Sequence, residues 1–154
     1  LVELSPPTAR RTAGLPGAGA AGGLGWALQG FTQARMAPGV RLVAELVDLP
    51  GACRGADVVF TGEGRVDAQT LAGKTVAGVL EVARTIGVPV VVFAGRIAPG
   101  AEKLVQRGVR EMVCITPPGQ SDEQALSRAE ENLVAAVSTW LRGFVWSSRA
   151  ELSR

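Results

Sequence analysis

The most chemically equipped stretch of the sequence is a polar, glycine-rich segment at residues 61–74. Its functional side chains are two carboxylates, two cations, an amide and a hydroxyl: Glu63, Asp67, Arg65, Lys74, Gln69 and Thr70. Glycines between them let backbone N–H groups approach an anion closely, and an arginine fork and a lysine ammonium suit phosphate or carboxylate oxygens. The carboxylates could hold a magnesium ion or orient a hydroxyl group. The segment therefore predicts a site for an anionic ligand.

The same segment has a structural alternative, in which its charged side chains pair with one another and its glycines shape a turn. Its end, Gly73-Lys74-Thr75, resembles the end of a P-loop ahead of a helix. The spacing argues against that motif, because its first glycine would be residue 68, which is alanine. We therefore expect Lys74 to contact phosphate only as a single charge.

A second glycine-rich stretch covers residues 17–25. Gly17, Gly19 and Gly22 have the bare spacing of a dinucleotide fingerprint, but Pro16 precedes them directly and no strand is predicted there. Close packing of a helix and anion binding at a helix N-terminus explain these glycines equally well. For the second interpretation the candidates are Gly19, Gly22 and Gly23. Arg96, which follows an apolar strand, is a further candidate for ligand contact.

The composition excludes several kinds of chemistry. The 154 residues are 47% hydrophobic and 19% charged, which is typical of a globular chain able to bury its own core. Histidine is absent and there are two cysteines, so zinc sites of the Cys/His kind, Ser-His-Asp triads and Cys-His pairs are excluded within this chain. Acid–base work falls to carboxylates, lysine or a metal-bound water. Cys53 and Cys114 are both expected to be buried.

The charge and hydropathy patterns narrow the expected partners. The net charge is +2, and no basic run interleaves with aromatic residues, so no nucleic-acid partner is expected. No apolar run reaches the length of about 18 residues that a membrane span needs, and no signal peptide is visible. We expect a cytoplasmic protein with a small-molecule substrate, and a homodimer is a further expectation.

The elements that would position the polar segment alternate between strands and helices. Strands are predicted at 57–61, 88–94 and 111–115, and helices at 75–86, 99–107 and 121–141. Gly87 is predicted to end the first of these helices and Ser121 to cap the last. Upstream, the glycine-rich stretch should open a helix that ends at Pro38-Gly39, whereas residues 40–44 fit either a short strand or the start of a helix.

This alternation predicts an α/β fold with a parallel sheet, right-handed crossovers and helices on both faces. In such sheets, ligands bind outside the carboxyl ends of the strands. The segments predicted at that edge are 62–74, 95–99 and 116–120. The first is the longest and the most polar, so it is the expected wall of the site.

Several blocks of the sequence, taken in order and spacing, resemble the first glycerate kinase family. They are residues 16–25, 38–40, 56–70, 73–74, 87–89 and 94–95, and together they extend over nearly the whole chain. The resemblance implies phosphoryl transfer from ATP with Mg²⁺ to glycerate, giving 2-phosphoglycerate. It also implies the C-terminal portion of a two-domain α/β kinase with the active site between the domains. Residues 1–55 would end an inserted domain, 56–146 would belong to a Rossmann-like domain, and 147–154 would form a frayed tail.

On this resemblance we assign candidate roles. The catalytic candidates are Glu63, Arg65, Asp67 and Lys74. The candidates for binding substrate or phosphate are Gly19, Gly22, Gly23, Gly62, Gly64, Gln69, Thr70 and Arg96, and the metal ligands stay open.

The chain also departs from the family's pattern. The family's Asp-Ser-Phe-Lys-Gly and Asp-Val-x-Asn-Pro-Leu stretches are absent, and Thr75-Val76 stands where a small residue and proline are frequent. Because phosphoryl transfer needs several charges around one phosphate, we expect this chain to be inactive by itself. The alternative hypothesis is a non-catalytic binding or assembly module that needs a partner chain.

Overall fold

The computed structural model describes residues 2–32, 34–70 and 75–151 and divides into two compact units, Leu1–Gly39 and Val40–Arg154. The sequence placed a domain boundary at residue 55, and the domain to which residues 40–55 belong stays a prediction. Within the described ranges, every helix falls short of the length and apolar character that a membrane crossing requires.

The first unit is a small helical hairpin. It contains two 3₁₀ turns, η1 (Val2–Leu4) and η2 (Ala20–Gly23), and two helices, α1 (Pro7–Thr12) and α2 (Leu24–Thr32). The indole nitrogen of Trp26 donates to the carbonyl of Ala9 over 2.6 Å. At Gly30, a Cβ atom would lie only 2.8 Å from the Cα of Ala9, so glycine lets the helices approach closely. The predicted glycine-rich opening of a helix is confirmed, although that helix ends at Thr32 rather than at Pro38-Gly39.

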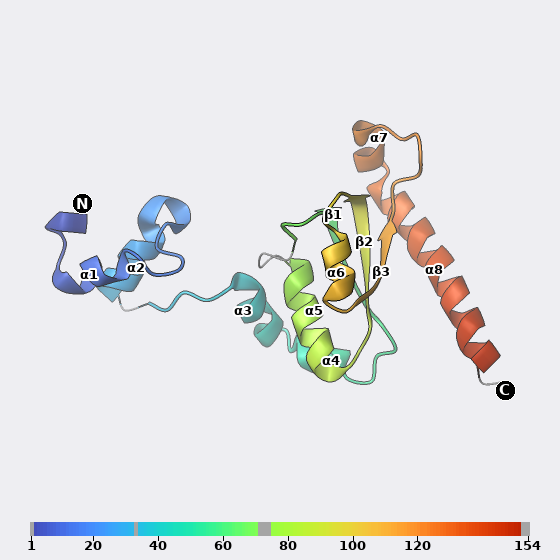
Figure 1. Ribbon diagram of the computed structural model, residues 1–154, viewed down its shortest axis with the longest axis horizontal. Helices are drawn as coiled ribbons and strands as arrows, with labels where there is room; N and C mark the ends of the chain where they lie inside the picture. The colour runs from blue at the N-terminus through green and yellow to red at the C-terminus, as the bar shows by residue number, and fades with distance from the viewer. Residues whose placement is uncertain (1, 33, 71–74, 152–154) are drawn as a thin grey trace. The chain divides into compact units, whose positions relative to one another are not determined.

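The second unit is built on a parallel sheet of three strands in the order β1-β2-β3 (Figure 1). The strands are β1 (Val59–Val66), β2 (Val90–Ile97) and β3 (Val109–Cys114), and β2 lies between the other two. The predicted α/β class and the parallel sheet are confirmed.

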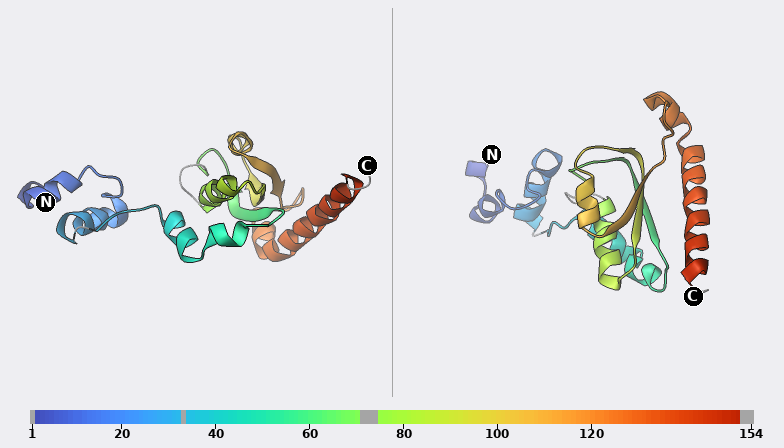
Figure 2. Two further views of the ribbon diagram at one scale, coloured as in Figure 1. Left: turned by 90° about the horizontal axis from the view of Figure 1, so that it is seen from below. Right: turned by 45° about the vertical axis from the view of Figure 1, so that its right-hand side comes forward.

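Helices cover both faces of this sheet (Figure 2). The helices of the second unit are α3 (Gly39–Leu46), α4 (Leu49–Cys53), α5 (Thr75–Ile86), α6 (Glu102–Gln106), α7 (Asp122–Ser127) and α8 (Ala129–Glu151). Helices α5 and α6 lie on one face and α8 on the other. The buried core lies under α5 and α6, where Val76, Leu80 and Leu104 meet β2. Residues 40–44 lie within α3, so of the two alternatives, a short strand or the start of a helix, the helix is correct.

Two strands are longer at their carboxyl ends than the sequence predicted. Residues 62–66 were expected to be loop, but they continue β1, and Arg96 lies inside β2 rather than after it. The reason is pairing: Glu63 is opposite Ala94, and Arg65 is opposite Arg96. Glycine makes this possible, because a Cβ atom at residue 62 would lie 2.6 Å from the carbonyl oxygen of Phe93.

Two further expectations need correction. The predicted long final helix is two helices, because Arg128 leaves the helical conformation at φ −112° and ψ 19° between α7 and α8. The hydroxyl of Ser127 donates to the carbonyl of Gln124, a local bond that competes with the regular ladder. Cys53 is buried as predicted, but Cys114 is exposed, since it ends β3.

The predicted ends of two helices are confirmed. Gly87, which follows α5, has φ 79°, the left-handed conformation that favours glycine. Ser121 caps α7 in a reciprocal arrangement, in which its hydroxyl accepts from the backbone of Gln124 and the Gln124 amide oxygen accepts from the backbone of Ser121.

Candidate functional site

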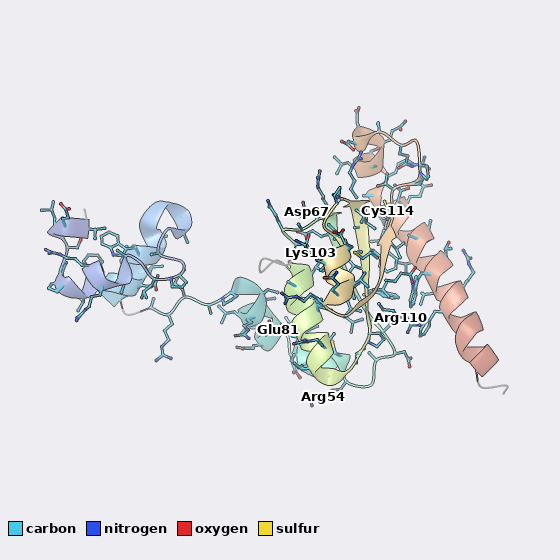
Figure 3. All side chains as sticks on the ribbon, viewed as in Figure 1. Arg54, Asp67, Glu81, Lys103, Arg110 and Cys114 are labelled. Atoms are coloured by element: carbon cyan, nitrogen blue, oxygen red, sulfur yellow. The ribbon has the colours of Figure 1, made fainter. Side chains whose placement is uncertain are left out.

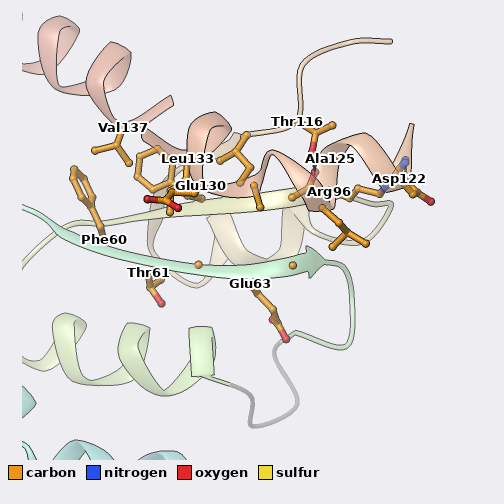
Figure 4. A pocket seen from close by; sticks show the side chains of 17 residues that line it. Phe60, Thr61, Glu63, Arg96, Thr116, Asp122, Ala125, Glu130, Leu133 and Val137 are labelled. Atoms are coloured by element: carbon orange, nitrogen blue, oxygen red, sulfur yellow. Dashed lines mark hydrogen bonds and ion pairs between the residues drawn. The ribbon is translucent and has the colours of Figure 1, made fainter. Parts of the chain in front are cut away.

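A pocket of about 820 Å³ lies between the carboxyl halves of β1 and β2 and the helices α7 and α8 (Figure 4). All of its lining residues belong to the second unit. They are Phe60, Thr61, Gly62, Glu63, Gly64, Phe93, Gly95, Arg96, Ile115, Thr116, Asp122, Ala125, Leu126, Ala129, Glu130, Leu133 and Val137. The pocket is therefore at the edge of the sheet where ligands of parallel α/β proteins bind.

Four of the predicted site residues line this pocket, and four others of the second unit do not. Those that line it are Gly62, Glu63, Gly64 and Arg96. Those that do not are Arg65, Asp67, Gln69 and Thr70. Lys74 lies outside the described residues. Gly19, Gly22 and Gly23 belong to the first unit, and their role in anion binding stays a prediction.

Glu63 belongs to β1, one of the two strands that form the floor of the pocket. Its side chain and that of Thr61 point to the opposite side of the strand from Phe60, as alternation along a strand requires (Figure 4). The Oε2 atom of Glu63 is buried. One oxygen of the carboxylate is therefore shielded from solvent.

An ion pair between Arg96 of β2 and Asp122 of α7 lies at one end of the pocket. Both side chains stay more than half exposed, at 53% and 75%, so the pair contributes little to stability and the guanidinium remains accessible to a ligand. Nearby, the hydroxyl of Thr116 donates to the Gly95 carbonyl over 2.6 Å, which holds the chain after β3 against the end of β2. Charged and polar groups thus gather where the strands end.

The residues after β1 form a closed turn instead of pocket wall. Asp67 Oδ1 accepts from the backbone N–H of Gln69 over 2.8 Å, and Thr70 Oγ1 accepts from the backbone N–H of Asp67 over 3.0 Å. Thr70 is fully buried, and Arg65 Nε lies 3.5 Å from Asp67 Oδ2. The structural alternative, in which residues of the segment bond to one another, therefore describes residues 65–70. Figure 3 shows Asp67 and Cys114 at the same end of the sheet.

The described residues contain no group of three or more Asp, Glu or Cys side chains placed to hold a metal ion. That arrangement does not conflict with Mg²⁺, which is usually held by one or two carboxylates together with phosphate oxygens and water. Glu63 and Asp67 supply carboxylates of this kind near the strand ends.

Away from the pocket lining, the guanidinium of Arg128 lowers the pKa of Glu131 by hydrogen bonding and charge attraction.

Sequence reasoning missed four polar residues of the pocket: Thr61, Thr116, Asp122 and Glu130. Thr116 was within reach, because the segment 116–120 was already predicted at the ligand edge of the sheet. In the sequence, Asp122 was only an acidic residue in the first turn of a predicted helix, and Glu130 lay in the middle of that helix. Their approach to the pocket depends on the break at Arg128, which local sequence patterns did not reveal.

The fold and the pocket define an α/β protein with a pocket at the carboxyl ends of parallel strands. A model of the glycerate kinase family matches residues 3–144. The chain therefore belongs to the glycerate kinase family, as the sequence resemblance implied.

Individual relatives agree with this placement. The chain is 39% identical over 137 residues to a glycerate kinase of Halalkalibacterium halodurans, covering 85% of this chain and 36% of the relative. It is 33% identical to the glycerate 2-kinase of Escherichia coli, covering 83% of this chain and 35% of the relative. A solved structure assigned as glycerate kinase 2 from Salmonella typhimurium LT2 superposes with a TM-score of 0.64 at 31% identity, covering 87% of this chain and 34% of that one. The chain spans about a third of these relatives and corresponds to their C-terminal part.

Proposed function

We propose that this chain supplies one wall of the active site of a kinase that transfers a phosphoryl group from ATP to glycerate, giving 2-phosphoglycerate. The observation that carries the proposal is the placement of the 62–64 segment and Arg96 in one pocket at the carboxyl edge of the sheet, in a chain of the glycerate kinase family. We place the enzyme in the cytoplasm, and the substrate is a small carboxylic acid.

The chemistry of each side chain suits it to a different role in binding or catalysis. Arg96 is accessible at the pocket end and attracts the negative charge of phosphate or carboxylate oxygens. Glu63 has a buried carboxylate oxygen, which suits it to accept a proton or orient a hydroxyl group. Arg65, near the end of β1, would bind the anionic parts of the two substrates, and Asp67, just after β1, would orient its guanidinium through their ion pair. The role of Lys74 as a further phosphate contact stays a proposal from the sequence.

The donor set fits a magnesium–nucleotide complex that brings its own phosphate ligands. Mg²⁺ supplies charge neutralisation on the phosphate oxygens when it is bound, and Glu63 or Asp67 would hold it through a carboxylate oxygen. Arg65 keeps the Asp67 carboxylate in position through their ion pair. The backbone bond from Gln69 to Asp67 fixes the same carboxylate from the other side.

Turnover should require residues beyond this chain, since phosphoryl transfer depends on several charges held around one phosphate. The chain spans about a third of its relatives, so the missing charges would come from the remaining part of the kinase. We therefore expect this chain alone to show no measurable phosphorylation of glycerate.

A chimera tests the proposal directly. In it, this chain replaces the matching part of the Halalkalibacterium glycerate kinase, and phosphorylation of glycerate is followed with ATP and Mg²⁺. Arg65→Ala should lower kcat by about 10²–10³, the usual loss when one stabilising donor is removed from a charged transition state. Arg54→Ala is the matched control, because Arg54 is exposed at the opposite end of the sheet (Figure 3). Equal turnover of Arg65→Ala and the unmodified chimera would contradict the assigned role.

A further inference from the structure

We propose that the apolar half of the pocket between β1 and α8 binds the purine ring of the nucleotide that donates the phosphoryl group. This inference rests on the proposed function, which requires a nucleotide but does not say where its base lies. It assigns a task to side chains of α7 and α8 that the phosphoryl-transfer chemistry leaves unused.

The size and character of the pocket favour a nucleotide base over the acceptor acid. Pockets for small molecules commonly measure about 300–1,000 Å³ and have mostly apolar walls with a few polar groups that fix orientation. The volume of about 820 Å³ lies in the upper part of that range. Glycerate is a three-carbon acid with oxygen on every carbon, so it is too small and too polar for these walls. A purine nucleoside matches both the volume and the apolar surface.

The walls of the apolar half offer flat and aliphatic surfaces to a planar ring. Phe60 of β1 and Phe93 of β2 line the floor in an edge-to-face pair with centroids 5.2 Å apart. Leu133 and Val137 of α8 line the opposite wall (Figure 4). Phe60 and Leu133 remain 37% and 41% exposed, so apolar surface is available for burial by a ligand. An aromatic base placed between these walls would gain both apolar burial and ring contacts.

The polar groups at the strand ends fix the direction of the nucleotide. Arg96, Thr116 and the open space at Gly64 lie where the phosphates of a base-bound nucleotide would emerge. Two carboxylates, those of Asp122 and Glu130, also line the pocket and repel a bare polyphosphate. The geometry therefore points to a base-first mode in which adenosine binds without phosphates and ATP binds better with Mg²⁺ than without it.

A pocket-filling substitution tests the inference on this chain, because the residues argued to contact the base belong to the chain. The probe is adenosine, titrated calorimetrically, with ribose as the ligand that lacks a base. Adenosine should bind saturably and ribose should not. Ala125→Trp, which fills the pocket from α7, should weaken adenosine binding about tenfold or more. Ala135→Trp is the matched control, because Ala135 is exposed on α8 and does not line the pocket.

Circular dichroism and thermal melting check that both tryptophan variants keep the fold. Absence of saturable adenosine binding by the folded chain overturns the inference, as does equal binding by Ala125→Trp and Ala135→Trp.

The chimera keeps this inference and the proposed function apart. If adenosine binds as expected but the chimera does not phosphorylate glycerate, the proposed function fails and the base site stands. If the chimera turns over but Ala125→Trp leaves its KM for ATP unchanged, the base site fails and the proposed function stands. The supporting result is a rise of about tenfold or more in the KM for ATP, with the KM for glycerate unchanged.

Discussion

The two faces of the sheet are packed very differently, although the same three strands form both. Under α5 and α6 lies the buried core, in which Leu104 and Val76 are each 0% exposed. Under α7 and α8 the glycines of β1 replace large side chains, and the pocket opens in the space they leave. One face therefore supplies most of the buried core, whereas the other leaves an open pocket.

The contrast is clearest for two leucines that differ mainly in the face they occupy. Leu104→Ala removes a fully buried side chain from the core and should lower the free energy of unfolding by about 2–5 kcal/mol. Leu133→Ala, on the pocket face, should lower it by about 1 kcal/mol or less, because the side chain is already 41% exposed. Urea denaturation followed by far-ultraviolet circular dichroism measures both. Similar losses at the two positions would remove the distinction between the faces.

Two glycines of β1 sharpen the comparison within the pocket face. Gly62→Ala should lower the free energy of unfolding by about 1–3 kcal/mol, because the new Cβ atom would lie 2.6 Å from the backbone oxygen of Phe93. Gly64→Ala should be tolerated, because a Cβ atom there meets nothing within 4 Å. Thermal melting of the two variants compares them. A larger loss of stability for Gly64→Ala than for Gly62→Ala would contradict the open space beside residue 64.

The smallest expected effect concerns the turn that follows β1. Thr70→Val keeps the shape of the side chain but removes the oxygen that accepts from the backbone N–H of Asp67. The free energy of unfolding should fall by about 0.5–1.5 kcal/mol, the net contribution of one such hydrogen bond. Gln69→Ala is the control, since Gln69 is exposed and takes part in the turn through its backbone N–H. Equal stabilities of the two variants in urea would argue against a structural role for the hydroxyl of Thr70.

Much of the fold could be predicted from local patterns. The apolar run before Gly95 and the helical spacing of residues 75–86 predicted β2 and α5, since both elements bury a continuous surface. The start of α7 followed from a capping residue whose partners are three positions away. Such features depend on neighbours in the sequence, so a single sequence contains the information.

The carboxyl half of β1 and the outer wall of the pocket could not be predicted in this way. Residues 62–66 contain glycine and charge, which are typical of a loop, and only pairing with β2 makes them a strand. Asp122 and Glu130 line the pocket from two separate helices, α7 and α8, which are divided at Arg128. The strand end and the pocket wall both depend on contacts between elements distant in the chain, so local sequence patterns did not predict them.

The aromatic contact between Phe60 and Trp140 provides an optical view of the pocket. The ring of Trp140 lies 5.2 Å from that of Phe60, which lines the pocket, and its indole N–H donates to Glu111 over 2.7 Å. Because the indole of Trp140 contacts Phe60 and is held by its hydrogen bond to Glu111, its fluorescence should respond to small changes at Phe60. Trp26 belongs to the other unit and contacts Ala9, so it offers an internal reference in the same spectrum. The chain thus has its own spectroscopic reporter beside the pocket, without any added label.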